Sequence, residues 1–156
     1  MRHNFQVCYD FMLELEGGRT LHHNTGEETH TYAGIYRAAH SEWLGWCYVD
    51  NGEEVPEELI LEFYEEEFWD KIHGDELPEG MDLQVFCTAV NTGVKNASVL
   101  LQRVLNVTQD GIIGSKTIAN AQRYEANAVG DKVVLDKLRD YCRESINYYG
   151  DVVDAD

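Results

Sequence analysis

The stretch that decides the fold of this chain is residues 83–105, which read LQVFCTAVNTGVKNASVLLQRVL. Its apolar residues recur at spacings of three and four, which is the periodicity of a helix with one buried face. Asn91-Thr92-Gly93 interrupts the pattern, so we expect two helices that are bent relative to each other. The first is thoroughly apolar on one side, and we expect it to be the central helix of the fold.

Helical spacing continues on both sides of this stretch. Residues 5–16 form an amphipathic pattern that Gly17-Gly18 would end. Residues 57–72 carry an apolar ladder in steps of four within an acidic run, which predicts an amphipathic helix with a solvated acidic face. The ladder consists of Ile60, Tyr64, Phe68 and Ile72. Ser115 is placed to cap a later helix, and we expect a C-terminal helix over 130–149.

The segment between the first helix and the acidic one is rich in Gly, Thr, Asn and His. It predicts a loop or small hairpin followed by a short helix near 35–39. Trp43, Trp46 and Tyr48 follow in a turn-rich stretch, where their rings would either line a cleft or form a satellite core cluster. The sum is a mainly α fold of about six helices, with a small irregular or β-hairpin element after the first helix.

The composition bounds the class of protein. With 156 residues, 17.8 kDa and 44% hydrophobic content, the chain is long enough to form a single compact domain. The formal net charge of -17 argues against a nucleic-acid partner, because phosphates would be repelled. The sequence shows neither a basic segment followed by an apolar run nor an apolar stretch of membrane-spanning length. We therefore expect neither a Sec signal nor stable membrane insertion.

A carboxyl group stands at the end of the first predicted helix. Glu16 lies where the unpaired carbonyls of a helix C-terminus collect partial negative charge, which disfavours a carboxylate. Burial against the core would disfavour it further, so we expect a raised pKa for Glu16. A protonated carboxylic acid beside two flexible glycines is what a general acid requires. The alternative reading of the same residues is a solvated glutamate at a glycine-capped helix end.

Other chemistries have less support in the sequence. His22, His23, Glu27, Glu28 and His30 lie close together, but their spacing is not that of a zinc-binding helix. We expect loop histidines there, with no metal and no cofactor. The sequence also lacks the elbow of a nucleophilic serine, an electropositive setting for a reactive cysteine and a phosphate-binding glycine loop.

Of the chemistries considered, catalysis by carboxyl groups is the one that the sequence supports. Glycoside hydrolysis needs a protonated acid at the leaving oxygen and a second group that attacks the anomeric carbon or orients water. Glu16 fits the first role. Glu27, Glu28 or the hydroxyl of Thr29 would fit the second if the loop folds back across the helix end.

Five motifs in order carry a resemblance to a known family. They are EGG at 16–18, NTGEET at 24–29 leading into YAGI at 32–35, LPEGMDL at 77–83 with VFCTAVNTG at 85–93, LLQ at 100–102 and DGIIGSKT at 110–117. Together they resemble the glycoside hydrolase family 108 muramidases, which are phage-type lysozymes and secretion-associated muramidases of lysozyme-like fold. The resemblance implies that Glu16 is the catalytic acid. It also implies a lysozyme-like domain with a catalytic part over 5–95 and a peptidoglycan-binding segment over 97–124.

The sequence departs from the family pattern opposite this acid. Family members commonly carry an Asp where this chain has Asn24, and an asparagine cannot act as a base. Glu27, Glu28 or Thr29 would then replace that Asp, and Thr29 lines up with a family threonine that we assign to positioning water. Our candidate catalytic residues are Glu16, Thr29 and Glu27, and our candidate substrate-binding residues are Asn24, Glu28, Tyr32 and Asn91.

The resemblance implies an N-acetylmuramidase that cleaves the β-1,4 bond between N-acetylmuramic acid and N-acetylglucosamine in bacterial peptidoglycan. The alternatives are a catalytically weak or inactive wall-binding or assembly protein on the same scaffold, and an acidic cytoplasmic interaction protein. We expect a monomer that is made in the cytoplasm and acts in the periplasm or cell wall, in phage lysis or wall remodelling. A holin or a secretion system would release it. The acidic charge disfavours binding to an anionic wall, and either local positive residues near the cleft or a substantial ionic strength would reduce the long-range repulsion.

Overall fold

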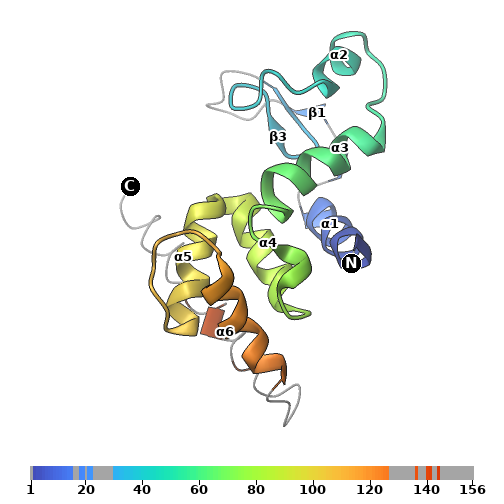
Figure 1. Ribbon diagram of the computed structural model, residues 1–156. Helices are drawn as coiled ribbons and strands as arrows, with labels where there is room; N and C mark the ends of the chain where they lie inside the picture. The colour runs from blue at the N-terminus through green and yellow to red at the C-terminus, as the bar shows by residue number, and fades with distance from the viewer. Residues whose placement is uncertain are drawn as a thin grey trace. The chain divides into compact units, whose positions relative to one another are not determined.

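The structure is a computed structural model that describes residues 2–15, 18–19, 21–22, 30–126, 136, 140, 141 and 144. Six α-helices lie in these residues: α1 Arg2–Leu15, α2 Gly45–Asp50, α3 Glu57–Tyr64, α4 Met81–Thr92, α5 Val94–Leu105 and α6 Ser115–Ala126 (Figure 1). The shorter elements are the strands β1 Leu21–His22, β2 Thr31–Tyr32 and β3 Ile35–Tyr36, the π-helical turn η1 Glu65–Trp69 and the 3-10 turn η2 Gly74–Glu76. The expected mainly α fold with a small β element after the first helix is therefore confirmed.

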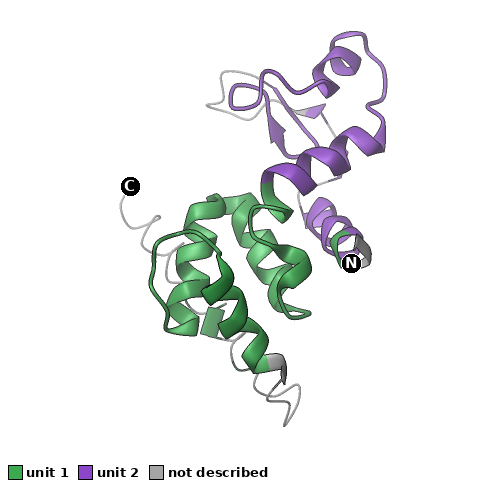
Figure 2. Cartoon of the chain, viewed as in Figure 1, with its two compact units in different colours: residues 1–5, 68–156 green, residues 6–67 purple. Residues whose placement is uncertain are grey.

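The chain divides into two compact units, one formed by residues 1–5 with 68–156 and the other by residues 6–67 (Figure 2). The expected lysozyme-like domain with a catalytic part over 5–95 and a binding segment over 97–124 stays a prediction, because compactness does not report where binding and catalysis lie. The expected helix over 130–149 lies outside the described residues, apart from Asp136, Asp140, Tyr141 and Glu144. Within the described part of the chain, no helix combines the length and apolarity that a membrane crossing requires.

The decisive stretch, residues 83–105, lies within α4 and α5, with Gly93 between them as expected. Gly93 has a φ of 93°, in the left-handed region that L side chains rarely adopt. Its N–H donates to the carbonyl of Ala89 at 2.8 Å, and its own carbonyl accepts from the N–H of Ala97 at 3.2 Å. Ala89, Ala97 and Ser98 are small and fully buried, so α4 packs closely against α5.

Three aromatic rings form the centre of the unit that contains α4 and α5. The ring centroid of Trp69 lies 5.4 Å from that of Phe5 and 5.5 Å from that of Phe86, and those of Phe5 and Phe86 lie 6.0 Å apart. Trp69 is only 1% exposed. The two pairs that include Phe86 are edge-to-face, and such pairs stabilise a core by about 0.5–1.5 kcal/mol each beyond the burial of area.

Trp69 occupies this position because α3 continues into the π-helical turn η1. Ile60, Tyr64 and Ile72 of the predicted ladder are fully buried, but Phe68 is only half-buried and Trp69 takes its place. The prediction that Phe68 lies on the buried face was therefore wrong by one residue. A π-helical turn adds one residue to the helix, so the buried face advances by five positions from Tyr64 instead of four.

The unit formed by residues 6–67 carries an antiparallel sheet in the order β1-β2-β3, with Leu21 opposite Tyr32 and Tyr32 opposite Ile35. Ala33 and Gly34 join β2 to β3 with φ values of 49° and 80°. Positive φ values at both central residues define a type I′ turn, whose twist matches that of the two strands that it joins. The expected short helix near 35–39 is therefore wrong: the tight turn sends Ile35 back along β2, where it favours a strand.

The helix of this region is α2, which lies where the sequence predicted a turn-rich stretch. Trp46 is 3% exposed, and its indole N–H donates to the carbonyl of His40 at 2.8 Å. The guanidinium of Arg37 lies 5.0 Å from the centroid of the Trp46 ring and contacts the carboxylate of Asp50 at 2.6 and 2.8 Å. These contacts hold the ring of Trp46 in place. Of the two roles predicted for the tryptophan stretch, Trp46 therefore has the satellite-core role.

The packing around Trp69 generates a stability prediction at Gly74, in η2. A Cβ at Gly74 would lie 2.3 Å from Cε2 of Trp69. We expect Gly74→Ala to lower the free energy of unfolding by about 1–3 kcal/mol, the usual cost of overpacking a core, in urea denaturation. Gly114→Ala is the matched control, because no described atom lies within 4 Å of its Cβ position. Equal stability of the two variants would contradict this packing.

Candidate active site

The candidate site begins at the C-terminus of α1, which ends at Leu15. Gly18 has a φ of 78°, and its N–H donates to the carbonyl of Leu13 at 2.8 Å. A glycine in the left-handed region that bonds back to the last turn is the common way to end a helix. The predicted stop is therefore confirmed at Gly18. Glu16 lies outside the described residues, but in the chain it directly follows the last residue of α1.

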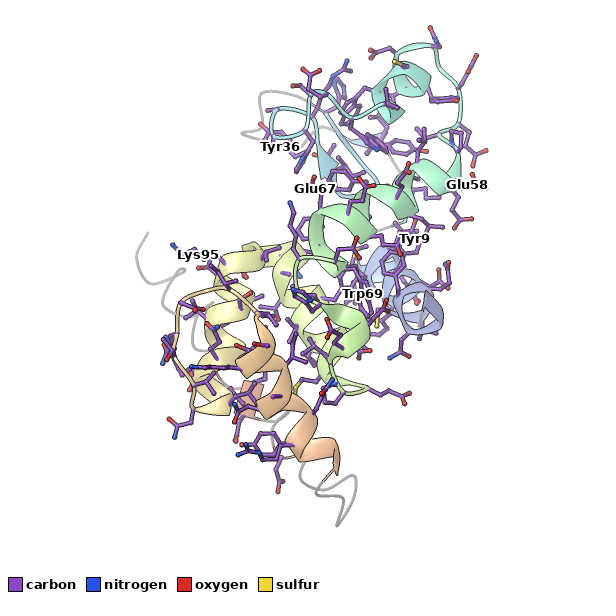
Figure 3. The ribbon with its side chains drawn as sticks, viewed as in Figure 1. Tyr9, Tyr36, Glu58, Glu67, Trp69 and Lys95 are labelled. Carbon is purple, nitrogen blue, oxygen red and sulfur yellow. The ribbon has the colours of Figure 1, made fainter. Side chains whose placement is uncertain are left out.

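Tyr9 connects α1 to the rest of the same unit (Figure 3). Its ring centroid lies 5.9 Å from that of Tyr64 on α3, and the Tyr64 hydroxyl donates to the carbonyl of Ala33 at 2.7 Å. One path of contacts thus joins α1, α3 and the β2–β3 turn. Burial, with a smaller contribution from the carboxylate of Glu57, raises the pKa of Tyr9 to about 12, while the charge of Arg19 opposes this.

Arg19 places a positive charge just after the end of α1. Its Nη2 donates to the carbonyl of Val55, which is fully buried, and its Nη1 lies 3.4 Å from the carboxylate of Glu54. The side chain of Arg19 is 27% exposed and that of Glu54 is 80% exposed, so this ion pair is partly screened by solvent. Sequence reasoning missed Arg19. The available signal was its position directly after the glycine pair.

The segment that carries most of the other candidates connects β1 to β2. His22 is paired with Thr31, so the two ends of this segment are adjacent in the sheet. The candidates on it, Asn24, Glu27, Glu28 and Thr29, lie outside the described residues. In the sequence they lie, as Glu16 does, between residues 6 and 67. Their roles stay predictions.

Two candidates for substrate binding lie within the described residues. Tyr32 is in β2, is 8% exposed, and its ring centroid lies 6.3 Å from that of Trp43. Asn91 is on α4, in the other compact unit, and its Nδ2 donates to the carbonyl of Cys87 at 2.8 Å. The amide of Asn91 is exposed, so its oxygen is accessible to solvent. Their binding roles stay predictions.

A hollow of about 410 Å³ opens beside α3 in the unit of residues 6–67. Its lining combines rings with carboxylates, including Trp43, Phe63, Glu62, Glu66 and Glu67. The indole N–H of Trp43 donates to the carbonyl of Leu59 at 3.3 Å, which fixes the ring at the wall of the hollow. Of the two readings of the tryptophan stretch, Trp43 therefore fits the cleft and Trp46 fits the satellite core. No group of three or more potential metal ligands occurs among the described residues.

The comparisons with known proteins identify the class. The chain has a mainly α fold with a small three-stranded sheet after its first helix. The chain belongs to the glycosyl hydrolase 108 family, because the family model described as "Glycosyl hydrolase 108" matches residues 9–93, more than half of the chain. The resemblance of the sequence motifs is thereby confirmed.

Two further comparisons extend this result. A second family model, described as "Predicted Peptidoglycan domain", matches residues 96–156. Among solved structures, SagA of Brucella abortus is similar, with a TM-score of 0.71 and 26% identity over 96% of this chain and 82% of that chain. A search of curated proteins found no match. The chain therefore belongs to a glycoside hydrolase family and carries a predicted peptidoglycan domain.

The pKa of Tyr9 generates a pH prediction. An unfolded tyrosine ionises near its usual pKa of 10.0, whereas folded Tyr9 keeps its proton up to a pKa of about 12. The folded state thus binds more protons between these values, so stability is fully present below pH 10 and is lost as the pH rises towards 12. By linkage the loss is up to about 3 kcal/mol, because each pKa unit corresponds to about 1.4 kcal/mol. Urea denaturation at several pH values should show a shallower decline for Tyr9→Phe, and equal slopes would refute the assignment.

Proposed function

We propose that the protein is a lysozyme-type N-acetylmuramidase that hydrolyses the β-1,4 bond between N-acetylmuramic acid and N-acetylglucosamine in peptidoglycan, with Glu16 as the general acid. The observation that carries the proposal is the end of α1 at Leu15, inside the family match over residues 9–93. The match of residues 96–156 to a predicted peptidoglycan domain supports peptidoglycan as the polymer.

The helix end gives Glu16 a reason to hold a proton. Unpaired carbonyls at a helix C-terminus carry about half a negative charge, which favours the neutral carboxylic acid. Arg19 acts in the opposite direction, but its guanidinium already contacts the carboxylate of Glu54 and the carbonyl of Val55. A neutral Glu16 donates its proton to the glycosidic oxygen as the bond to the anomeric carbon breaks.

The second half of the reaction needs a group that brings water to the anomeric carbon. We assign this to Glu27 and Thr29, on the segment whose ends are held together by the pairing of His22 with Thr31. Glu27 accepts the proton of the water, and the Thr29 hydroxyl orients it. We assign binding of the sugar chain to Asn24, Glu28 and Tyr32, and the binding role of Asn91 stays a sequence prediction.

Replacement of Glu16 tests the proposal directly. We expect Glu16→Gln, which is nearly isosteric but cannot donate the proton, to reduce the release of reducing ends from purified sacculi by roughly a hundred- to ten-thousandfold. The helical circular dichroism signal should be unchanged. Glu14→Gln is the matched control, because Glu14 is an exposed carboxylate of α1. Full activity of Glu16→Gln would refute the proposal, and mass spectrometry of the products reports whether N-acetylmuramic acid carries the new reducing end.

Asn24 motivates a second candidate function, a wall-binding protein with little catalytic activity. If the family Asp acts as a base, an asparagine removes that base, and Asn24→Asp should raise the rate of hydrolysis by about tenfold or more. The readout is again the release of reducing ends from sacculi. An unchanged rate in Asn24→Asp means that Glu27 or Thr29 already supplies the function. The wall-binding alternative predicts co-sedimentation of the wild-type protein with sacculi and no release of reducing ends.

We place the activity in the periplasm or cell wall, where the proposed substrate lies. A protein made in the cytoplasm would reach that compartment through a holin in phage lysis or through a secretion system in wall remodelling. Both routes suit a monomer that needs no cofactor, because acid catalysis by side chains requires only water as co-substrate.

A further inference from the structure

A second hollow, of about 530 Å³, lies in the segment that matches the predicted peptidoglycan domain. It is formed by the end of α5, the connection over 106–114 and the first turn of α6, which follow one another along the chain in Figure 1. The residues of its lining that matter below are Val107, Thr108, Ile112, Ser115, Lys116 and Asn120. This hollow lies entirely within one compact unit.

Gln102 holds the wall of this hollow in one arrangement. Gln102 is 1% exposed, and the two N–H groups of its Nε2 are shared among three acceptors: Asp110 Oδ1 at 2.8 Å, the carbonyl of Ile112 at 2.9 Å and Thr117 Oγ1 at 3.2 Å. Its Oε1 accepts from the N–H of Gly111 at 2.9 Å. A buried amide with all of its bonds made rigidifies the backbone around it. The connection therefore presents a preformed surface.

Residues 94–126, which contain this hollow, carry a net charge opposite in sign to that of the whole chain. Residues 94–126 contain four Lys or Arg and two Asp or Glu, a formal net charge of +2 in a chain of net charge -17. One of the two acids, Asp110, accepts bonds from the N–H of Ile112 and from Gln102, and these bonds lower its pKa. The aliphatic stem of Lys95, on α5, lies against Gly111 of the connection. Asp110 and Lys116 both line the hollow, so the attraction for an anionic group is local to the ammonium of Lys116.

The lining selects a peptide over a sugar. Ile112 is 70% exposed and Val107 is half-buried, so small apolar groups have a surface to contact. Lys116 supplies a cation, and Thr108, Ser115 and Asn120 supply hydroxyl and amide groups. None of the described residues that line this hollow is aromatic, although aromatic faces are the usual partners of a pyranose ring.

We propose that this hollow binds the peptide stem of peptidoglycan, with the ammonium of Lys116 paired to a free carboxylate of the stem and Ile112 against its methyl side chains. The inference rests on the proposed function for the identity of the polymer. Stem peptides carry free carboxylates and alanine methyl groups, which match a site of one cation and one exposed aliphatic surface. Binding there would hold an acidic enzyme on an anionic wall.

Nuclear magnetic resonance titration of the full ¹⁵N-labelled chain tests the proposal. The probes are a muramyl tetrapeptide with free carboxylates, the same tetrapeptide with every carboxylate amidated, and chitotetraose as a peptide-free glycan. We expect the free tetrapeptide to shift the backbone amides of Thr108, Ile112 and Lys116. The amidated probe should bind several-fold more weakly at these amides, and chitotetraose should leave them unshifted.

The matched variants are Lys116→Gln and Arg123→Gln, two exposed cations of α6 of which only Lys116 lines the hollow. We expect Lys116→Gln to weaken tetrapeptide binding roughly three- to tenfold, the effect of one charge-assisted contact that is partly open to solvent. Arg123→Gln should retain wild-type affinity. Equal affinity of Lys116→Gln and wild type, or shifts at the hollow with chitotetraose, would overturn the inference.

The outcomes separate this inference from the proposed function. A protein that releases reducing ends from sacculi but shows no tetrapeptide shift at the hollow refutes the inference and leaves the proposed muramidase intact. Tetrapeptide binding that depends on Lys116, together with full hydrolysis by Glu16→Gln, supports the inference and refutes the assigned acid. The tetrapeptide contains no glycosidic bond, so its binding is measured independently of catalysis.

Discussion

The π-helical turn η1 is the constraint on which the two cores depend. Before it, Tyr64 contacts Tyr9 and the carbonyl of Ala33, within the unit of residues 6–67. After it, Trp69 packs with Phe5 and Phe86, within the other unit. An α-helical turn would present Phe68 at this point and move Trp69 off the buried face. One added residue thus lets a single helical segment contribute a large side chain to each core.

The sequence predicted those parts of the fold that depend on local spacing. The helix pair around Gly93 and the end of α1 at Gly18 follow from apolar periodicity and from glycine at helix ends. The π-helical turn could not be predicted, because a ladder in steps of four is also what a continuous α-helix would show. The short helix near 35–39 was wrong because Ala33 adopts a positive φ, which local propensity does not favour and which the hydrogen bond from Tyr64 stabilises.

In the candidate site too, local patterns pointed to some residues and long-range packing brought in the others. Glu16 was singled out by a rule about helix ends; α1 ends at Leu15, and the role of Glu16 stays a prediction. Tyr9, Arg19 and Glu57 come together only through the packing of α1, the sheet and α3, so no local pattern pointed to them. The same is true of Gln102, whose partners lie up to 15 positions further along the chain. Long-range hydrogen bonds of buried side chains are the part of a site that a single sequence reveals least.

The position of Gly93 between α4 and α5 limits how this protein can be altered. The two family matches meet beside it, at residues 93 and 96, yet α4 and α5 on either side share one close-packed interface. The part of the chain that follows Gly93 is therefore not an independent module that recombination could exchange without disturbing this interface. A new wall specificity would have to be grafted onto the surface around Ile112 and Lys116, leaving Ala89, Ala97 and Ser98 as they are. Evolution of binding and integrity of the hydrolase fold are coupled through three small side chains.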